Sequence, residues 1–199
     1  MIRVRHNGVE SGVDASRFAH LGDLILAFLR ADARQTLVAE RVSVNGCEIP
    51  EESLEKLELF PLDDIHEIEI GSAAAAEIAF SSLENSRAYA EQLEIAFGRI
   101  AEGLRAGRVE EANRIYADAI DGLTLLVFAV TAAGRELGRG GADLVGMDSA
   151  VMPSLEQLVE AQQDQDWVRV ADTLEYELGP AIGVWRERIC AAERAGRTA

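Results

Sequence analysis

The stretch EANRIYADAIDGLTLLVFAVTAA, residues Glu111–Ala133, decides how the rest of the chain has to fold. Apolar residues three and four positions apart form one helical stripe along it. The stripe consists of Ala112, Ile115, Tyr116, Ala119, Ile120, Leu123, Leu126, Val127 and Val130. A second apolar face is formed by Leu125, Phe128 and Ala129. A soluble helix with two apolar faces needs cover on two sides, so the stretch predicts the central helix of a bundle.

The composition is that of a globular, strongly acidic protein. Of the 199 residues, 48% are hydrophobic and 27% are charged, and 35 acidic residues outnumber 19 basic ones to give a net charge of −16. Such a surface repels phosphate groups, so we expect neither a nucleic acid nor an anionic membrane as partner. The acidity promotes solubility. A second interpretation is a surface that selects basic or weakly folded partners.

The sequence indicates a soluble cytoplasmic protein. Acidic residues such as Glu10 and Asp23 interrupt any apolar core that a signal peptide would need. The longest uncharged run of the central helix, Gly122–Gly134, has 13 residues, whereas a membrane span needs about 20. The cysteines, Cys47 and Cys190, lie far apart and are expected to be two buried thiols in a reducing cytoplasm.

The choice between lysine and arginine points to a bacterial source. Lys56 is the only lysine, and the other 18 basic residues are arginine. Together with the abundance of alanine, this usage suggests a GC-rich bacterial genome.

Residues 1–72 show the patterns of strands and of helices in alternation. The Asn7-Gly8 and Asn45-Gly46 pairs predict two tight hairpin turns. Spacing then predicts a strand at Ile2–Val4, a returning strand at Val13–Phe18, a helix over Leu21–Leu29, strands at Leu37–Val44 and Cys47–Ile49, a short helix after Pro50 and a last strand at His66–Ile70.

This order resembles the β-grasp (ubiquitin-like) fold over residues 1–72. The resemblance implies a small domain that serves as a binding module. Some members of that superfamily are sulfur carriers or protein modifiers that act through a free C-terminal Gly-Gly. Here Gly71 is followed by Ser72 and a long helical remainder, so we do not expect that chemistry.

Residues 73–199 have the spacing of long helix, long helix, short helix and long helix. The first of these has a stripe of residues expected to be buried: Leu83, Ser86, Ala90, Leu93, Phe97, Ile100 and Leu104. Gly107 suits the position after a helix end, and the glycines between Gly134 and Gly146 predict a flexible linker. Because short loops place consecutive helices antiparallel, we predict an α+β protein with an antiparallel four-helix bundle over 73–199.

The last predicted helix contains a proline and three large aromatic residues. Pro180 lacks a backbone N–H and clashes with the carbonyl of Tyr176, so a kink is expected there. Tyr176, Trp167 and Trp185 are expected to pack in the core, as large aromatic residues on helices usually do.

Two segments of the helical region resemble the flagellin-type export chaperones of bacteria. The segments are GRVEEANRIYADAIDGLTLL (Gly107–Leu126) and LVEAQQDQDWVRVADTLEYELGPAIGVWRERI (Leu158–Ile189). Those chaperones are small, acidic, cytoplasmic helical bundles that hold an export substrate before its secretion. The resemblance implies a protein partner related to export or motility, and it implies no particular binding residues.

The sequence carries no catalytic or metal-binding motif. The three histidines, His6, His20 and His66, lack the short spacing of metal ligands and are expected at the surface. Asp172 and Glu175 fall on one helical face before Pro180, and a solvated acidic face is the expectation for them. We therefore predict no catalytic, cofactor-binding or metal-binding residues and no cofactor.

Three functions remain open. The first is a non-catalytic protein-interaction protein, such as a chaperone or adaptor, which binds its partner through Leu125, Phe128 and Ala129. The second is an enzyme or small-molecule binder with a site between the two domains near Asp172 and Glu175. The third is a structural homodimer in which Leu125 and Phe128 pair across a symmetry axis. We favour the first, with which dimerisation is compatible.

Overall fold

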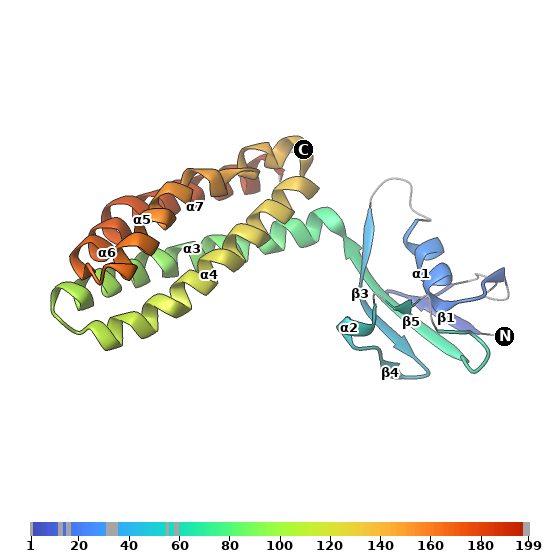
Figure 1. Cartoon of the computed structure of the whole chain (residues 1–199). Coiled ribbons are helices and arrows are strands. Elements are labelled where there is room, and N and C mark those ends of the chain that lie inside the picture. Colours follow the sequence, from blue (N-terminus) through green and yellow to red (C-terminus); the bar gives the residue numbers. More distant parts are fainter. Residues whose placement is uncertain are drawn as a thin grey trace. The chain divides into compact units, whose positions relative to one another are not determined.

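The computed structural model describes residues 2–11, 14, 17–30, 36–54, 56–57 and 60–196, and it confirms an α+β protein (Figure 1). The chain divides into two compact units, Met1–Ile78 and Ala79–Ala199, here called the sheet unit and the helical unit. The division lies a few residues beyond the predicted boundary at 72/73. The last strand continues to Ala74, and the first long helix follows it without a loop.

The sheet unit contains a mixed sheet of five strands. Its elements are β1 (Arg3–His6), β2 (Val9–Ser11), α1 (Leu21–Leu29), β3 (Leu37–Val44), β4 (Cys47–Glu48), α2 (Glu51–Leu54) and β5 (Glu67–Ala74). The strand order is β2-β1-β5-β3-β4. The β1–β5 pair is parallel, whereas β1–β2, β3–β4 and β3–β5 are antiparallel. The last strand in the chain therefore lies at the centre of the sheet.

The predicted second strand at Val13–Phe18 is wrong. The chain turns back at once after Asn7-Gly8, so β2 begins at Val9, which pairs with His6. Arg17 and Phe18 lie outside any strand. The rest of that prediction falls partly on residues 13, 15 and 16, which lie outside the described residues.

The core of the sheet unit forms between α1 and one face of the sheet. Of the five residues of α1 that spacing placed on one face, four are buried (Leu21, Leu24, Ile25 and Phe28) and Leu29 is half-buried. They belong to one cluster with the buried strand residues Val4, Val42, Ile68 and Ile70. The predicted short helix exists as α2, and the side chain of Leu54 lies outside the described residues.

The two Asn-Gly turns hold β5 at both of its ends. Asn7 and Asn45 have positive φ angles of 49° and 51°, and each is followed by a glycine at φ 79°, as type I′ hairpins require. The Asn7 side chain accepts a hydrogen bond from the backbone N–H of Ser72 (2.8 Å) and donates one to its carbonyl (3.1 Å). The Asn45 side chain accepts from the N–H groups of His66 (2.8 Å) and Glu67 (3.1 Å).

The contribution of the Asn45 side-chain hydrogen bonds to stability can be measured with Asn45→Gly. Glycine adopts the same left-handed backbone without strain, so the variant loses only the side-chain hydrogen bonds, which include a third one to the Asp64 carbonyl (3.0 Å). We expect the free energy of unfolding of the sheet unit to fall by about 1–2 kcal/mol. Hydrogen exchange of the β5 amides in urea reports this unit alone. Unchanged protection in Asn45→Gly would show that the side-chain bonds contribute nothing.

The helical unit is built from three long helical stretches and one shorter helix (Figure 1). Its elements are α3 (Ala75–Arg105), α4 (Val109–Glu136), the 3₁₀ helices η3 (Gly138–Leu144) and η4 (Met147–Ala150), α5 (Met152–Gln163), α6 (Trp167–Thr173), the π-helical turn η5 (Leu174–Leu178) and α7 (Gly179–Gly196). Because α6, η5 and α7 follow one another without a break, the predicted order of long, long, short and long is confirmed.

Local signals fix the ends of two of these helices. Gly107, at φ 75°, ends α3, and the N–H of Arg108 bonds to the Gly103 carbonyl at 2.9 Å, as expected of a glycine after a helix end. Asp166 caps α6 by accepting a hydrogen bond from the Arg169 N–H at 3.0 Å.

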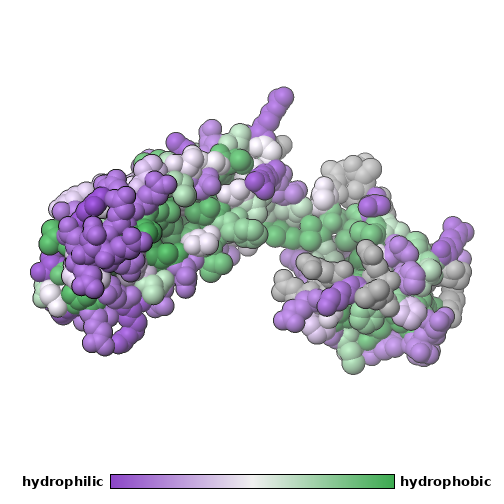
Figure 2. All heavy atoms as spheres, in the orientation of Figure 1, coloured by the Kyte–Doolittle hydropathy of each residue, from purple (hydrophilic) through white to green (hydrophobic). Residues whose placement is uncertain are grey.

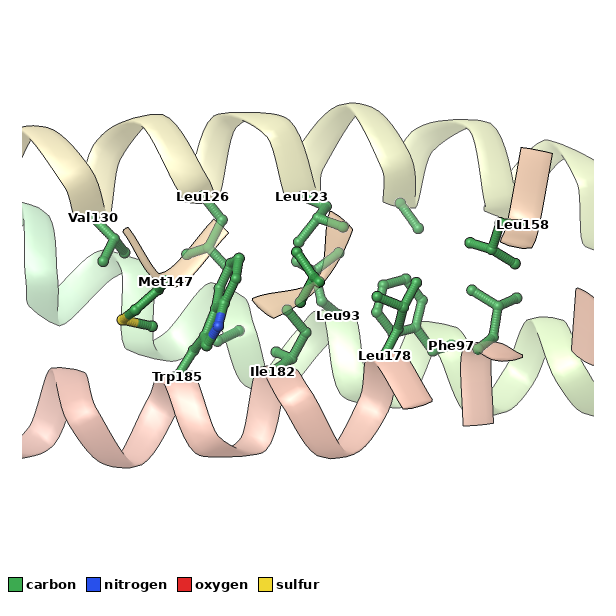
Figure 3. Packing of buried hydrophobic residues seen from close by; sticks show 14 of the residues in the cluster. Leu93, Phe97, Leu123, Leu126, Val130, Met147, Leu158, Leu178, Ile182 and Trp185 are labelled. Atoms are coloured by element: carbon green, nitrogen blue, oxygen red, sulfur yellow. The ribbon is translucent and has the colours of Figure 1, made fainter. Parts of the chain in front are cut away.

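The core of the helical unit lies along the line where α3, α4 and α7 face one another (Figure 3). All seven residues of the predicted stripe on α3 are buried. The view labels core residues from α3 (Leu93, Phe97), α4 (Leu123, Leu126, Val130), η4 (Met147), α5 (Leu158), η5 (Leu178) and α7 (Ile182, Trp185).

The predicted flexible linker between Gly134 and Gly146 is wrong. The segment forms η3 and η4, which pack against α4, and Leu144 and Met147 are buried in the core. Two glycines make this packing possible. A Cβ atom added to Gly141 would lie 2.4 Å from the carbonyl oxygen of Gly134 and 2.6 Å from its Cα. Glycine serves here for a close backbone approach rather than for flexibility.

A π-helical turn, Leu174–Leu178, lies directly before Pro180, where the sequence predicts a kink. The N–H of Gly179 bonds to the carbonyl of Leu174, five residues earlier. The wider turn lies just before Pro180, which has no N–H to continue the regular α-helical ladder.

Helix α4 is long and apolar enough to cross a membrane by length and composition alone, and 28% of its most apolar window is buried. Its stripe packs in the core of the helical unit, and Asp118 and Asp121 interrupt its exposed side. A single helix of this kind, most of it exposed, is weak evidence for a membrane span, and we describe the chain as a soluble protein.

Candidate functional site

The exposed face of α4 is the feature that distinguishes this molecule. Leu125 is 69% exposed and Phe128 is 75% exposed, while Ala129 is half-buried beside them. On the same helix Leu126 is only 2% exposed. Five residues of the first apolar face are buried (Ala112, Ala119, Leu123, Leu126 and Val130), and its other four are half-buried. The expected cover on the second face is absent from the described part of the chain, which leaves two large apolar side chains in water.

Small and uncharged residues extend this apolar surface along α4. Thr124 and Ala132 are exposed, and charged residues appear only toward the ends, at Asp121 and Arg135. We call the exposed residues Asp121, Thr124, Leu125, Phe128, Ala132 and Arg135, together with the half-buried Ala129, the α4 face. In Figure 2 hydrophobic residues gather along the middle of the helical unit, and hydrophilic ones cover the end where α3 turns into α4.

Among the residues that the structure describes, the charges at the two ends of the α4 face have no partners. The ion pairs near α4 join Arg108 to Glu102 and to Glu111, at the start of the helix. Within the described ranges, Asp121 and Arg135 take part in no hydrogen bond or ion pair. The face thus presents an apolar centre, an acidic N-terminal end and a basic C-terminal end.

A second cluster forms around Asp172 and Glu175, which lie on one face as predicted. Both carboxylates bind Arg105 at the end of α3, with 2.7 Å between Arg105 Nη2 and Asp172 Oδ1. The hydrogen bonds that the Arg105 guanidinium donates to Asp172 and then to Glu175 raise its pKa. The guanidinium carbon also lies 5.6 Å from the centre of the Tyr176 ring.

Tyr176 was expected in the core, and this prediction is wrong. Its side chain is 67% exposed, whereas Trp185 is buried and Trp167 is half-buried. Tyr176 lies nine residues after Trp167 and nine before Trp185. Nine residues make two and a half helical turns, which place Tyr176 on the opposite side of the helix. Its ring contacts the guanidinium of Arg105 instead of the core.

Glu177 points to the other side of the π-helical turn. Its carboxylate accepts hydrogen bonds from Ser154 (2.8 Å) and Gln157 (3.4 Å) of α5. A shallow groove of about 540 Å³ lies here between α5 and α6, lined by Gln157, Asp166, Val168, Arg169, Asp172, Thr173, Tyr176 and Glu177. The groove is open to solvent, and its carboxylates already have partners.

In this arrangement Asp172 and Glu175 join the π-helical stretch to the end of α3 through Arg105. A carboxylate that acts as a general base must be able to reach a substrate proton, and both of these are engaged by one arginine. The partner that both carboxylates share, Arg105, belongs to the helical unit. Sequence spacing showed that the pair shares a face. It gave no signal for Arg105, since the contact joins residues 67 apart along the chain.

The other candidate ligands do not converge. No group of three or more His, Cys, Asp or Glu side chains that could hold a metal ion occurs among the described residues. The His6 ring forms a hydrogen bond with the Ser72 hydroxyl, with 2.6 Å between His6 Nε2 and Ser72 Oγ. His20 and His66 are exposed. Cys47 and Cys190 are free thiols, but Cys47 is exposed, in contrast to the expected burial.

Comparison with known proteins gives one finding. No curated protein and no solved structure matches the chain. The model of a family described as a domain of unknown function, DUF8042, matches residues 81–188. The match begins and ends within the helical unit and includes α4 and the Arg105 cluster. Since it covers more than half of the 199 residues, the chain belongs to the DUF8042 family.

Proposed function

We propose that the protein is a non-catalytic interaction protein, chaperone-like or adaptor, that binds a protein partner through the α4 face. The observation that carries this proposal is the exposure of Leu125 and Phe128 in the middle of a core helix. Burial of one such side chain contributes about 1.5–3 kcal/mol, so a partner that covers both has a substantial driving force. Single exposed apolar residues are common, but here two lie together at the uncharged centre of one face.

The proposal includes a finer description of the two units. We assign residues 1–72 to the β-grasp fold, supported by the strand order β2-β1-β5-β3-β4, the parallel β1–β5 pair and the helix after β2. We assign residues 73–199 to an antiparallel four-helix bundle, supported by the order of three long helical stretches and α5. In this proposal the β-grasp unit is a further binding module.

The partner we propose is a protein of the bacterial cytoplasm, related to export or motility. The resemblance of Gly107–Leu126 and Leu158–Ile189 to export chaperones supports this assignment. A net charge of −16 supports a basic or weakly folded segment as the partner. The alternative, an enzyme or small-molecule site at Asp172 and Glu175, has less support because Arg105 pairs with both.

A capture experiment with two matched variants tests the proposal. The tagged wild type, Phe128→Asp and Ile95→Asp chains are incubated with cytosol of the native organism, and captured proteins are identified and then rebound as purified components. Ile95 is a fair control because it is 60% exposed on α3 and lies outside the α4 face. We expect one partner retained by the wild type and Ile95→Asp and lost by Phe128→Asp. Equal capture by all three chains would refute the assignment of the α4 face.

A further inference from the structure

We infer that the α4 face pairs with the α4 face of a second copy of this chain, with the two helices antiparallel and the symmetry axis at Phe128. The inference rests on the proposed role of the α4 face as a protein-binding surface and names one occupant of it. It also specifies which residues meet, which an exposed apolar surface alone does not.

The spacing of the α4 face is that of a helix that packs against another helix. Asp121, Thr124, Phe128, Ala132 and Arg135 follow one another at intervals of three and four residues, so they form one straight strip along α4. All five are exposed. Threonine and alanine on either side of Phe128 let a second helix approach closely while the phenylalanine fills the centre.

The strip is complementary to itself only when one copy is reversed. Asp121 lies seven residues before Phe128, and Arg135 lies seven residues after it. Seven residues are close to two full turns, so all three side chains point the same way. A two-fold axis at Phe128 brings Asp121 of each copy opposite Arg135 of the other. Thr124 and Ala132, four residues on either side, meet in the same manner.

A parallel pairing in register is disfavoured by the same charges. It would place Asp121 against Asp121 and Arg135 against Arg135, and like charges in contact are unfavourable. The antiparallel pair instead gives partners to two charges per copy that have none within the described chain. A two-fold interface of this kind uses one surface on both copies and closes after two chains.

The energetics predict a weak dimer whose orientation is set by charge. The two Phe128 side chains and the neighbouring Leu125 residues provide the buried apolar area. The Asp121–Arg135 pairs are near the rim, where ion pairs contribute at most about 1 kcal/mol each. We therefore expect the apparent mass to rise with protein concentration toward that of two chains.

Charge reversal tests the pairing directly. Asp121→Arg places four positive charges around the axis, and Arg135→Asp places four negative ones. The dissociation constant of each single-variant dimer should therefore be at least about ten-fold higher than that of the wild type. A mixture of the two single variants should form a heterodimer, because both of its charge pairs are then Asp with Arg. The double variant Asp121→Arg/Arg135→Asp should recover the wild-type dimer.

Light scattering after size exclusion, or sedimentation equilibrium, measures all of these chains in full length. Glu187→Arg is the matched control, since Glu187 is an exposed acid on α7, and its dimer should equal that of the wild type. Circular dichroism confirms that each variant is folded. Phe128→Asp should be monomeric at every concentration.

Two results would overturn the inference. One is a wild-type chain that stays monomeric at its highest soluble concentration. The other is a dimer that survives both single charge reversals or is not restored when the two variants are mixed. Neither result touches the proposed function, which fails only if Phe128→Asp captures the same partner as the wild type.

Discussion

Gly141→Ala is expected to lower the free energy of unfolding of the helical unit by about 2–4 kcal/mol. The added Cβ would overlap the carbonyl oxygen, the Cα and the carbonyl carbon of Gly134, at 2.4, 2.6 and 2.9 Å. All three are backbone atoms of α4, so no side-chain rotation can relieve the overlap. The 3₁₀ segment would have to move away from α4 and uncover Leu144, which is fully buried there. Urea unfolding followed by circular dichroism measures the change.

The neighbouring glycine is the control for this effect. A Cβ at Gly140 would have no atom within 4 Å, and its backbone is not in the left-handed region. Gly140→Ala should therefore leave the free energy of unfolding unchanged or raise it by about 0.4–1 kcal/mol, because alanine lowers the conformational entropy of the unfolded chain. If Gly141→Ala and Gly140→Ala behave alike, the close approach of η3 to α4 does not determine stability.

The second large effect is expected from Leu126→Asp, which should lower the free energy of unfolding by about 4 kcal/mol or more and leave much of the protein unfolded. Leu126 is 2% exposed and lies in the core with Trp185 and Met147 (Figure 3). The substitution removes buried apolar contacts and places a carboxylate where no partner is available.

Phe128→Asp, two residues further along α4, is the matched comparison. It introduces the same charge at a side chain that is 75% exposed, so the free energy of unfolding of the isolated chain should change by no more than about 0.5 kcal/mol. Thermal unfolding of both variants at low protein concentration separates the two faces of α4. Equal loss of stability in the two variants would mean that the second face is covered after all.

Sequence periodicity predicted the buried side of the helices well. The stripe on α3 from Leu83 to Leu104 is buried at every predicted position. Helical geometry alone decides which residues share a face, so such a prediction needs no knowledge of the partner. The same holds for the turns, since Asn7-Gly8 and Asn45-Gly46 require a backbone that few other pairs adopt.

Periodicity could not show whether another element of the chain covers each apolar face of α4. Leu125 and Phe128 read as apolar, and the expected cover followed from that property alone. Whether a covering element exists depends on long-range packing, which in this chain buries only one side of α4. The prediction of a flexible linker around Gly141 was wrong for a related reason. Glycine suits both a flexible linker and a close backbone contact, and only the position of Gly134 distinguishes the two.

The sequence predicted which residues belong to the candidate site but not which interactions they make. Leu125, Phe128 and the pair Asp172/Glu175 were all identified from spacing. The partner that neutralises the acidic pair, Arg105, comes from another helix and leaves no trace in the local sequence. Asp121 and Arg135, the charged ends of the α4 face, each lie seven residues from Phe128 in the sequence. An apolar periodicity does not reveal them, because it contains no charged residues.

The central place of β5 has a consequence for the order of folding. The hairpins β1–β2 and β3–β4 are local and can form within microseconds, but they do not touch each other in the strand order β2-β1-β5-β3-β4. Only β5, the last strand to be synthesised, joins them, and its pairing with β1 spans some sixty residues of chain, the kind of non-local contact that slows folding. We therefore expect the five-stranded sheet to form only after Glu67–Ala74 has been synthesised.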